Sequence, residues 1–489
     1  MVRVFLEMVL NRRVGMVDSM MRAMRLLGVG FFTLMVAAVT RAEKQPNFII
    51  LLGDDISAVS LGSFGAENPG TSPHIDRLAA EGVVFRNMFV SEAICAPVRA
   101  ELYTGLQPVR NGVYMNHQPT YEGTKSVVHY LSELGYRVAL TGKRHFSPKS
   151  VYPFEFLEGF PQGANDRFVP PEDWSEVEAF VQRDPEQPFC LIICSIHAHS
   201  PWDSGDSRDW DLDTLKLPPH FPDTMESRLH YREYLAEVKL FDGQVGKSLA
   251  MMKRLGLDDS TALIVLDENG AGMPGGKWSS YDWGVRSACV MKWPERYAAR
   301  IDTDALAMYC DILPTMIEAA GGQVPDDIDG RSLLGLITGR ETKHRDYAFF
   351  VHNNATSGTP YPVRGVTDGR YKFIWNLAPE SINAQPTING FDYGFEDKMK
   401  DRPERFMYLS WLEKAQSDPA AQAMVDRFRK RPEFQLFDLD ADPWELENLA
   451  GRADLAAHQQ RLKIALEKWM KQQGDSGAAM DVVPTKQKR

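Results

Sequence analysis

The sequence is poor in cysteine, with five among 489 residues: Cys95, Cys190, Cys194, Cys289 and Cys310. A small, odd number of cysteines does not indicate a disulfide framework. Cys190 and Cys194 share one apolar run, and on a strand their side chains would share a face about 13 Å apart, too far for a disulfide. We interpret these two as small buried hydrophobic residues.

Basic blocks, internal repeats and long hydrophobic runs are also missing. The chain has 44% hydrophobic and 25% charged residues and a net charge of −11. This balance excludes a mostly disordered chain, a coiled coil and a multi-span membrane protein, and we expect no stable membrane span. An acidic chain without a basic block is not expected to bind nucleic acid. An anionic substrate would therefore need a local cluster of cations.

Residues 1–42 have the features of a secretory signal peptide. Arg22 and Arg25 precede an uncharged run, residues 26–39, and small residues end the segment at Ala42. The run is too short to span a bilayer as an ordinary helix. The alternative is an uncleaved anchor or a buried helix. We expect an exported protein whose mature chain begins near Glu43. Residues 1–19 are interpreted as an over-called start, because three methionines form more typical beginnings: Met20, Met21 and Met24.

Four short apolar runs each end abruptly in polar side chains. The runs cover residues 48–52, 136–140, 189–194 and 262–266. Continuous apolar runs separated by helical stretches predict a parallel sheet covered on both faces, in an α/β fold. In such a sheet the ligand site lies beyond the carboxyl ends of the strands, so we expect the polar groups that follow the four runs to converge.

The intervals and the C-terminal part have their own patterns. Ser72 caps a helix that opens at Pro73, and helices are predicted over residues 231–255 and 311–320. From about residue 367 the texture changes, with strands predicted over 370–375 and 434–439 and a closing helix over 459–472. We expect a main domain over 43–366, a smaller α+β subdomain over 367–474 and a disordered tail over 475–489.

Oxygen-bearing side chains follow the first and the fourth apolar run. Asp54 and Asp55 repel each other unless a cation lies between them, and Glu268 and Asn269 add oxygen atoms from another strand end. A ligand set of oxygen alone favours Ca²⁺ or Mg²⁺ over Zn²⁺. One Asp pair is more often a solvated turn, but two such sets at neighbouring strand ends favour a metal site.

The segment CAPVRAELYTG at residues 95–105 is the most specific motif in the chain. Cys95, Pro97 and Arg99 have the spacing of the type I sulfatase signature, and the segment resembles that family. The resemblance implies that a formylglycine-generating enzyme oxidises Cys95 to formylglycine. Val98 stands where the family usually has Ser, but the Cys-x-Pro-x-Arg core is intact. The alternative is a buried thiol in a turn.

Other motifs resemble the same family across nearly all of the exported chain. They are Gly-Lys-Arg-His at 142–145, Ala-His-Ser-Pro-Trp at 198–202, and Glu-Asn-Gly at 268–270 in place of Asp-Asn-Gly, with Lys277 as the expected sulfate-binding cation. The resemblance implies an alkaline-phosphatase-like sandwich with a large, mostly parallel central sheet and a C-terminal subdomain with an antiparallel sheet. It also implies one Ca²⁺ held by Asp54, Asp55, residue 95, Glu268 and Asn269. Glu268 is a departure, so Asp267 is an alternative source of the carboxylate.

The resemblance also implies a mechanism. One hydroxyl of hydrated formylglycine attacks the sulfur, and the other expels sulfate as the aldehyde re-forms. Lys143 and Lys277 are expected to stabilise the developing charge, and Arg99 is expected to hold the aldehyde hydrate. His199 is expected to protonate the leaving group, and His145 is expected to lie against the hydroxyls of the nucleophile. His197 is interpreted as structural or supporting rather than as a ligand.

Narrower motifs resemble the N-sulfoglucosamine sulfohydrolases, the heparan sulfamidases. These are Val-Tyr-Pro-Phe at 151–154, Tyr-Pro-Val-Arg at 361–364 and, after the cysteine motif, Asn-Gly-Val-Tyr at 111–114 with His117-Gln118. They imply glycosaminoglycan degradation, with sulfated sugar as substrate. Arg364 is the candidate for gripping the sugar acid or sulfate, with a structural ion pair as the alternative.

Two other functions stay open. One is the same machinery acting on an O-sulfated polysaccharide or on a phosphoester. A two-zinc phosphatase would need a Thr or Ser nucleophile with more Asp and His ligands, which the sequence lacks. The other is a non-catalytic glycan-binding relative.

Overall fold

The computed structural model describes residues 44–163, 172–294, 300–354, 359–385, 387–388 and 403–482. Residues 1–45 and 46–489 form separate units. The signal peptide expected over residues 1–42 lies outside the described residues. Among those described, no helix combines the length and the apolar composition that a membrane span requires.

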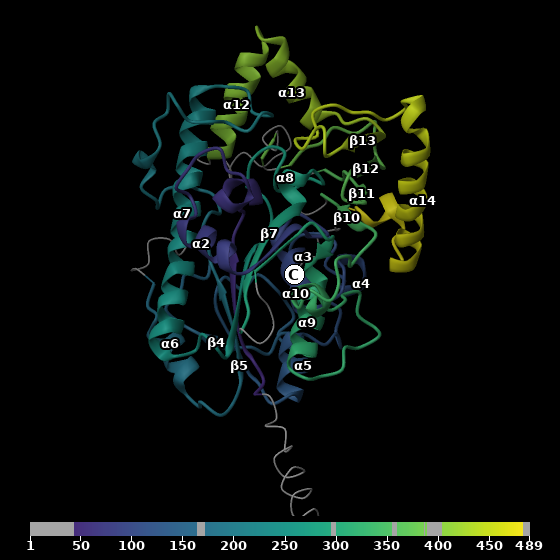
Figure 1. Cartoon of the computed structure of the whole chain (residues 1–489). Coiled ribbons are helices and arrows are strands. Elements are labelled where there is room, and N and C mark those ends of the chain that lie inside the picture. The colour runs from purple at the N-terminus through teal and green to yellow at the C-terminus, as the bar shows by residue number, and fades with distance from the viewer. Residues whose placement is uncertain are drawn as a thin grey trace, which may run out of the picture. The chain divides into compact units, whose positions relative to one another are not determined.

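Within the described residues nine strands form the larger sheet, in the order β4-β3-β5-β1-β6-β7-β2-β8, with β9 paired to β2 (Figure 1). The five strands from β4 to β6 are mutually parallel, and β7 runs antiparallel to both of its neighbours. Their bounds are β1 Asn47–Gly53, β2 Val83–Phe89, β3 Arg137–Gly142, β4 Glu155–Leu157, β5 Phe189–Cys194, β6 Thr261–Asp267, β7 Arg286–Lys292, β8 Ile301–Thr303 and β9 Ala307–Met308. The four predicted strands are therefore confirmed as β1, β3, β5 and β6.

Helices cover both faces of this sheet, which explains the continuous apolar runs. In β1, Ile49 and Leu51 pack into one core, whereas Phe48, Ile50 and Leu52 pack into the other. The helices are α2 Pro73–Glu81, α6 Ser175–Gln182 and α7 Met225–Leu255 on the first face, and α3 Cys95–Thr104, α5 Val127–Glu133, α9 Ile312–Ala319 and α10 Leu334–Ile337 on the second, with the short helices α4 Pro108–Asn111 and α8 Asp282–Val285.

A second sheet, antiparallel, has the order β10-β11-β12-β13 among the described residues. Its strands are β10 Ala348–His352, β11 Val363–Thr367, β12 Tyr371–Asn376 and β13 Phe434–Asp438; the remaining helices are α12 Pro403–Ala415, α13 Pro419–Arg429 and α14 Ala456–Gln473. Helix α14 packs on β11 and β12, and α12 packs on α7 (Figure 1). The expected boundary at residues 366 and 367 falls at the end of β11, so this sheet begins before it.

The structure corrects the expected disorder after Gly474 for residues 475–482. Asp475 pairs with Arg364, and Asp481 accepts backbone N–H bonds from Asn354 and Tyr361. These partners lie more than 100 residues away in the chain, and they tie the segment to the second sheet. Sequence texture alone does not reveal such long-range bonds.

Candidate active site

The polar residues after the parallel strands meet at one edge of the larger sheet. Backbone hydrogen bonds join the strand ends: the Glu268 N–H donates to the Gly53 carbonyl at 2.9 Å, and the Lys143 N–H donates to the Cys194 carbonyl at 3.2 Å. Gly142 makes the second contact possible, because its φ is +82° and a Cβ there would lie 1.9 Å from the Cys194 oxygen. The expected convergence of β1, β3, β5 and β6 is confirmed.

Cys95 is the first residue of α3 and points at this edge with 2% of its surface exposed. Its Sγ lies 3.0 Å from Lys277 Nζ and 3.3 Å from Lys143 Nζ, and 3.9 Å from Oδ1 of both Asp54 and Asp55. Burial, with the nearby carboxylates, raises the pKa of the thiol to about 12. Unmodified Cys95 is therefore protonated at neutral pH and is a poor nucleophile.

Three cations and three carboxylates surround Cys95, and they form three buried ion pairs. The pairs are Lys143 Nζ with Asp54 at 2.7 Å, Lys277 Nζ with Asp55 at 2.8 Å, and Arg99 Nε with Glu268 at 2.7 Å. Burial opposes the charge on Glu268, but Arg99 and Lys143 hold its pKa well below the ordinary value. Burial raises the pKa of Asp54. We call these six residues and Cys95 the cysteine cluster.

The oxygen atoms of the cysteine cluster suit a hard divalent cation. One ligand atom from each of Asp54, Asp55, Cys95 and Glu268 lies within 4.8 Å of the others, and Asp267 is not in this group. Asn269 Oδ1 is buried and has no hydrogen-bond partner among the described residues, which leaves this oxygen for a ligand. Glu268 Oε2 is also buried and lies 3.5 Å from Lys143 Nζ. A divalent ion would bring the balanced cluster to a net charge of about +2, which suits a sulfate group.

Two of the expected histidines lie beside the cysteine cluster. His199 Nδ1 donates to the Ser200 carbonyl at 2.7 Å, and Nε2 lies 3.8 Å from Asp55 Oδ2. Burial and Lys143 lower the pKa of His145 to about 2, so its imidazole is neutral. His197 pairs instead with Glu237 at 2.6 Å, which agrees with a supporting role.

His117 is a neighbour that the sequence motifs did not single out as a site residue. Its Nδ1 lies 2.8 Å from His145 Nε2, and burial lowers its pKa. The available signal was the His117-Gln118 pair after the cysteine motif, which carries no information about contact with residue 145. The two neutral rings form a hydrogen-bonded pair that fixes the position of His145.

Arg364 lies outside this cluster. It is fully buried, and its Nε and Nη2 donate to the Asp475 carboxylate at 2.5 and 2.9 Å. Nη1 donates to the Asn353 side chain at 3.2 Å and to the carbonyls of His352 and Val363. These contacts are those of the structural ion pair, the alternative left open by the sequence.

Comparisons with known proteins agree with this arrangement. Residues 46–322 match the sulfatase family, and residues 276–382 match the family described as N-sulphoglucosamine sulphohydrolase, C-terminal. The chain is 29% identical over 445 residues to an ulvan-active sulfatase of Formosa agariphila, covering 88% of this chain and 81% of that protein. It is 26% identical over 492 residues to the human N-sulphoglucosamine sulphohydrolase, covering 89% and 92%.

A solved structure in complex with its substrate, D-glucosamine-2-N,6-O-disulfate, superposes with a TM-score of 0.66 at 19% identity, over 88% of this chain and 99% of that chain. The predicted alkaline-phosphatase-like fold, with its mostly parallel sheet and smaller antiparallel sheet, is confirmed. The chain belongs to the sulfatase family. It is a sulfatase, a sulfuric ester hydrolase.

Proposed function

We propose that the protein is an exported, formylglycine-dependent sulfatase that removes sulfate from N-sulfated glucosamine. The observation that carries this proposal is Cys95 held between Lys143, Lys277 and three buried carboxylates. The N-sulfated substrate is supported by the family match over residues 276–382 and by the likeness to the human sulphohydrolase. We also propose the N-terminal signal and maturation of Cys95 by a formylglycine-generating enzyme.

Two groups would complete the site. A Ca²⁺ held by Asp54, Asp55, residue 95, Glu268 and Asn269 would supply Lewis acidity and two positive charges. Formylglycine at position 95, when hydrated, would supply a hydroxyl as nucleophile and a second hydroxyl for release of sulfate.

The side chains of the chain itself bind and orient the substrate. Lys143 and Lys277 place ammonium groups 3.3 and 3.0 Å from Cys95 Sγ, the position that a formylglycine oxygen would take and where negative charge would develop. Arg99 is anchored to Glu268 and to the Lys143 carbonyl, and its Nη2 has no hydrogen-bond partner among the described residues. That donor is available to the hydroxyls of residue 95.

The two histidines hold protons. The Ser200 carbonyl fixes His199 Nδ1 as a donor, so Nε2 is the ring nitrogen that would deliver a proton to the leaving group. His145 is neutral and is held by His117 through Nε2, so Nδ1 is the ring nitrogen that would serve the residue 95 hydroxyls. Because a sugar amine or alkoxide is a poor leaving group, loss of His199 should slow sulfate release most with such substrates.

A second candidate function is hydrolysis of an O-sulfated polysaccharide. It is favoured by the 29% identity to the ulvan-active sulfatase over 88% of this chain. The same cluster would carry out this reaction, with a different leaving group.

The test is sulfate release by protein co-expressed with a formylglycine-generating enzyme, using glucosamine sulfated at N or at O6, with Cys95→Ala as control. We expect release from the N-sulfated sugar and loss of release in the variant. Release from the 6-O-sulfated sugar alone would keep the mechanism and refute the substrate. If Cys95 is converted and neither sugar is cleaved, the proposed substrate class is wrong.

A further inference from the structure

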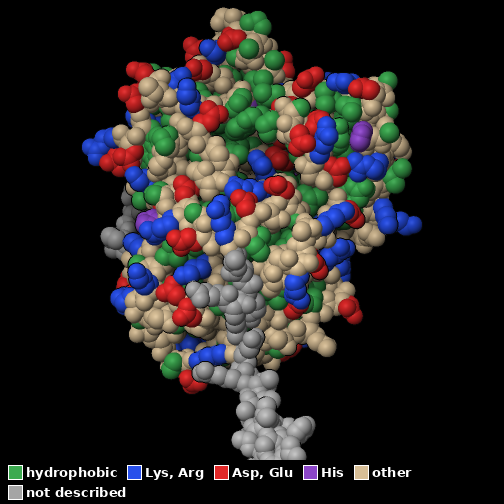
Figure 2. Space-filling model, in the orientation of Figure 1, with side chains coloured by type: hydrophobic (Ala, Val, Ile, Leu, Met, Phe, Trp, Pro, Cys, Tyr) green, Lys and Arg blue, Asp and Glu red, His purple; other side chains and the backbone are tan. Residues whose placement is uncertain are grey.

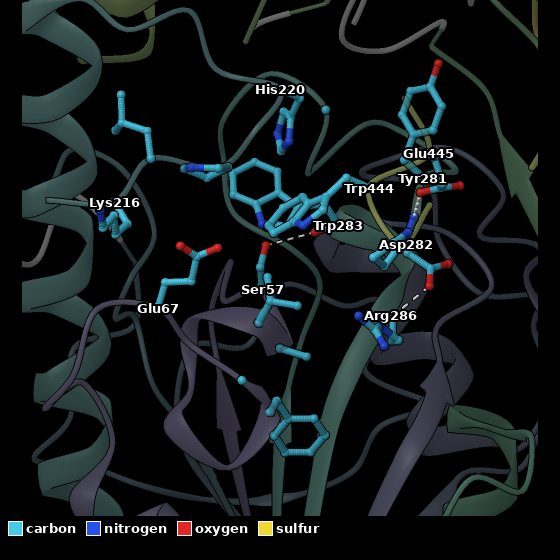
Figure 3. Close-up of a pocket in the computed structure, with 18 of the residues that line it drawn as sticks. Ser57, Glu67, Lys216, His220, Tyr281, Asp282, Trp283, Arg286, Trp444 and Glu445 are labelled. Atoms are coloured by element: carbon cyan, nitrogen blue, oxygen red, sulfur yellow. Dashed lines mark hydrogen bonds and ion pairs between the residues drawn. The ribbon is translucent and has the colours of Figure 1, made fainter. Parts of the chain in front are cut away.

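A cavity of about 240 Å³ is lined by Gly275, two residues before Lys277, and by the labelled side chains of Figure 3. Lys277 contacts Cys95, whereas Gly275 and Trp283, the latter in helix α8, line the cavity. No residue of the cysteine cluster lines it. The cavity is therefore a second place where a ligand could bind, separated from the cluster by one loop.

Two indole rings form an aromatic wall of this cavity. Trp283 is 6% exposed, and Trp444 is half-buried. The His220 ring packs 4.6 Å from Trp283 and 5.5 Å from Trp444 between centroids, and Figure 3 shows the three rings grouped together. The flat, electron-rich face of an indole suits the C–H face of a pyranose ring, whose hydrogens carry partial positive charge.

Two buried polar atoms of the wall have no hydrogen-bond partner among the described residues: Trp283 Nε1, a donor, and His220 Nε2. His220 is 3% exposed, and burial with Arg427 lowers its pKa to about 3, so its ring is neutral. Buried donors and acceptors without partners are rare, because each loses its hydrogen bonds to water. A sugar hydroxyl both donates and accepts, so it can satisfy either atom.

The charges around the cavity favour an anion. The charged side chains that line it are Lys216, Arg286 and Arg427, with Glu67, Asp282 and Glu445. Lys372 is fully buried and does not line the cavity, but it lies 2.6 Å from Asp282 and 3.3 Å from Glu445. Counted with the three cations of the lining, it gives four cations against three carboxylates. Lys216 is exposed and makes no ion pair with another described residue. This local excess of positive charge occurs in a chain of net charge −11.

The size of the cavity limits the ligand. Its volume lies below the roughly 300–1,000 Å³ typical of sites for drug-sized ligands. One ring fits this volume better than a chain of rings. The aromatic wall, the two buried atoms that a hydroxyl could bond and the positive charge all suit a single acidic sugar ring.

We propose that this cavity binds one acidic sugar residue, a pyranose carrying a carboxylate or sulfate group, stacked on Trp444 beside the buried Trp283, with its anion toward Lys216. The site does not depend on which bond the cysteine cluster cleaves. Its occupation would also hold the loop that positions Lys277.

Titration calorimetry of the Cys95→Ala protein with D-glucuronate, and with D-glucose as the neutral control, tests this site. We expect Trp444→Ala and Lys216→Glu each to weaken glucuronate binding about tenfold or more, and glucose to bind at least about tenfold more weakly. Trp444→Phe keeps a ring and should retain most of the binding, which guards against a folding defect. Trp375→Ala, at a half-buried indole of β12 outside the cavity, should change nothing.

Unchanged binding in both Trp444→Ala and Lys216→Glu, equal binding of glucose, or no binding of glucuronate would overturn the proposal. Sulfate release by the otherwise native Trp444→Ala enzyme is measured beside it. If glucuronate binding is lost and sulfate release is retained, the cavity and the proposed sulfatase site act independently. If no sulfate is released while glucuronate still binds the cavity, the proposed function fails and the cavity proposal stands.

Discussion

Arg364→Met is expected to destabilise the protein without changing catalysis by the molecules that fold. Arg364 and Asp475 are both fully buried, and the guanidinium contacts the carboxylate through two nitrogens at 2.5 and 2.9 Å. Removing one partner leaves the other charge buried and unpaired, which costs about 3–5 kcal/mol. The entropy of unfolding is about 2 cal/mol/K per residue, so for a protein of this size the midpoint of thermal unfolding should fall by about 3–5 °C.

The assay combines thermal unfolding, followed by circular dichroism, with kcat and KM for sulfate release. Arg370→Met is the matched control, since Arg370 makes a similar pair with Asp438 on an exposed surface, where water and salt screen the charges. Its midpoint should barely move. Arg364→Met combined with Asp475→Leu should recover much of the loss, because no buried charge is then left unpaired. A normal midpoint in Arg364→Met with KM raised tenfold or more would refute the structural role and support a grip on the substrate.

Three further results are expected. Burial raises the pKa of Glu101 from an ordinary 4.5 to about 7, so the folded protein binds this proton more tightly than the unfolded chain does. The free energy of unfolding should therefore fall as pH rises from about 5 through 7. Glu101→Gln should flatten that slope in thermal unfolding, and an equal slope in the variant would contradict the prediction. Removal of divalent ions by a chelator should abolish sulfate release. Added Ca²⁺ should raise the midpoint of thermal unfolding of the native protein but not of Glu268→Gln. An equal rise in both proteins would mean that Glu268 does not hold the ion. His117→Phe removes the partner of His145 and should lower kcat about tenfold with KM little changed, whereas a change in KM alone would argue against a role in positioning His145.

Much of the fold can be predicted from the sequence because each buried strand is a continuous apolar run. The runs in β1, β3, β5 and β6 end within a few residues of a polar group, and the geometry of a parallel sheet brings those ends together. The antiparallel β7 between β6 and β2 has no such signal, since it is buried in the same way as the parallel strands of the sheet.

The sequence predicts the site residues that belong to a motif. It does not predict those that belong to the site only through contacts in the folded protein. Cys95, Lys143 and Lys277 converge as expected, and the choice between Asp267 and Glu268 needed coordinates. The partners of Arg364 and His145 lie 111 and 28 residues away, and neither distance follows a local pattern. Acidic and basic side chains are interspersed over the face of the described residues drawn in Figure 2, so charge alone does not single out a site on that face.

The most direct test of the central claim relates activity to the chemical state of residue 95. Preparations made with graded amounts of a formylglycine-generating enzyme are digested with trypsin, and the peptide covering residues 87–99 is analysed by mass spectrometry for the fraction of aldehyde. Sulfate release from N-sulfated glucosamine is measured on the same samples. The rate should rise in proportion to the aldehyde fraction and extrapolate to zero for unconverted Cys95. A rate independent of that fraction would contradict the account.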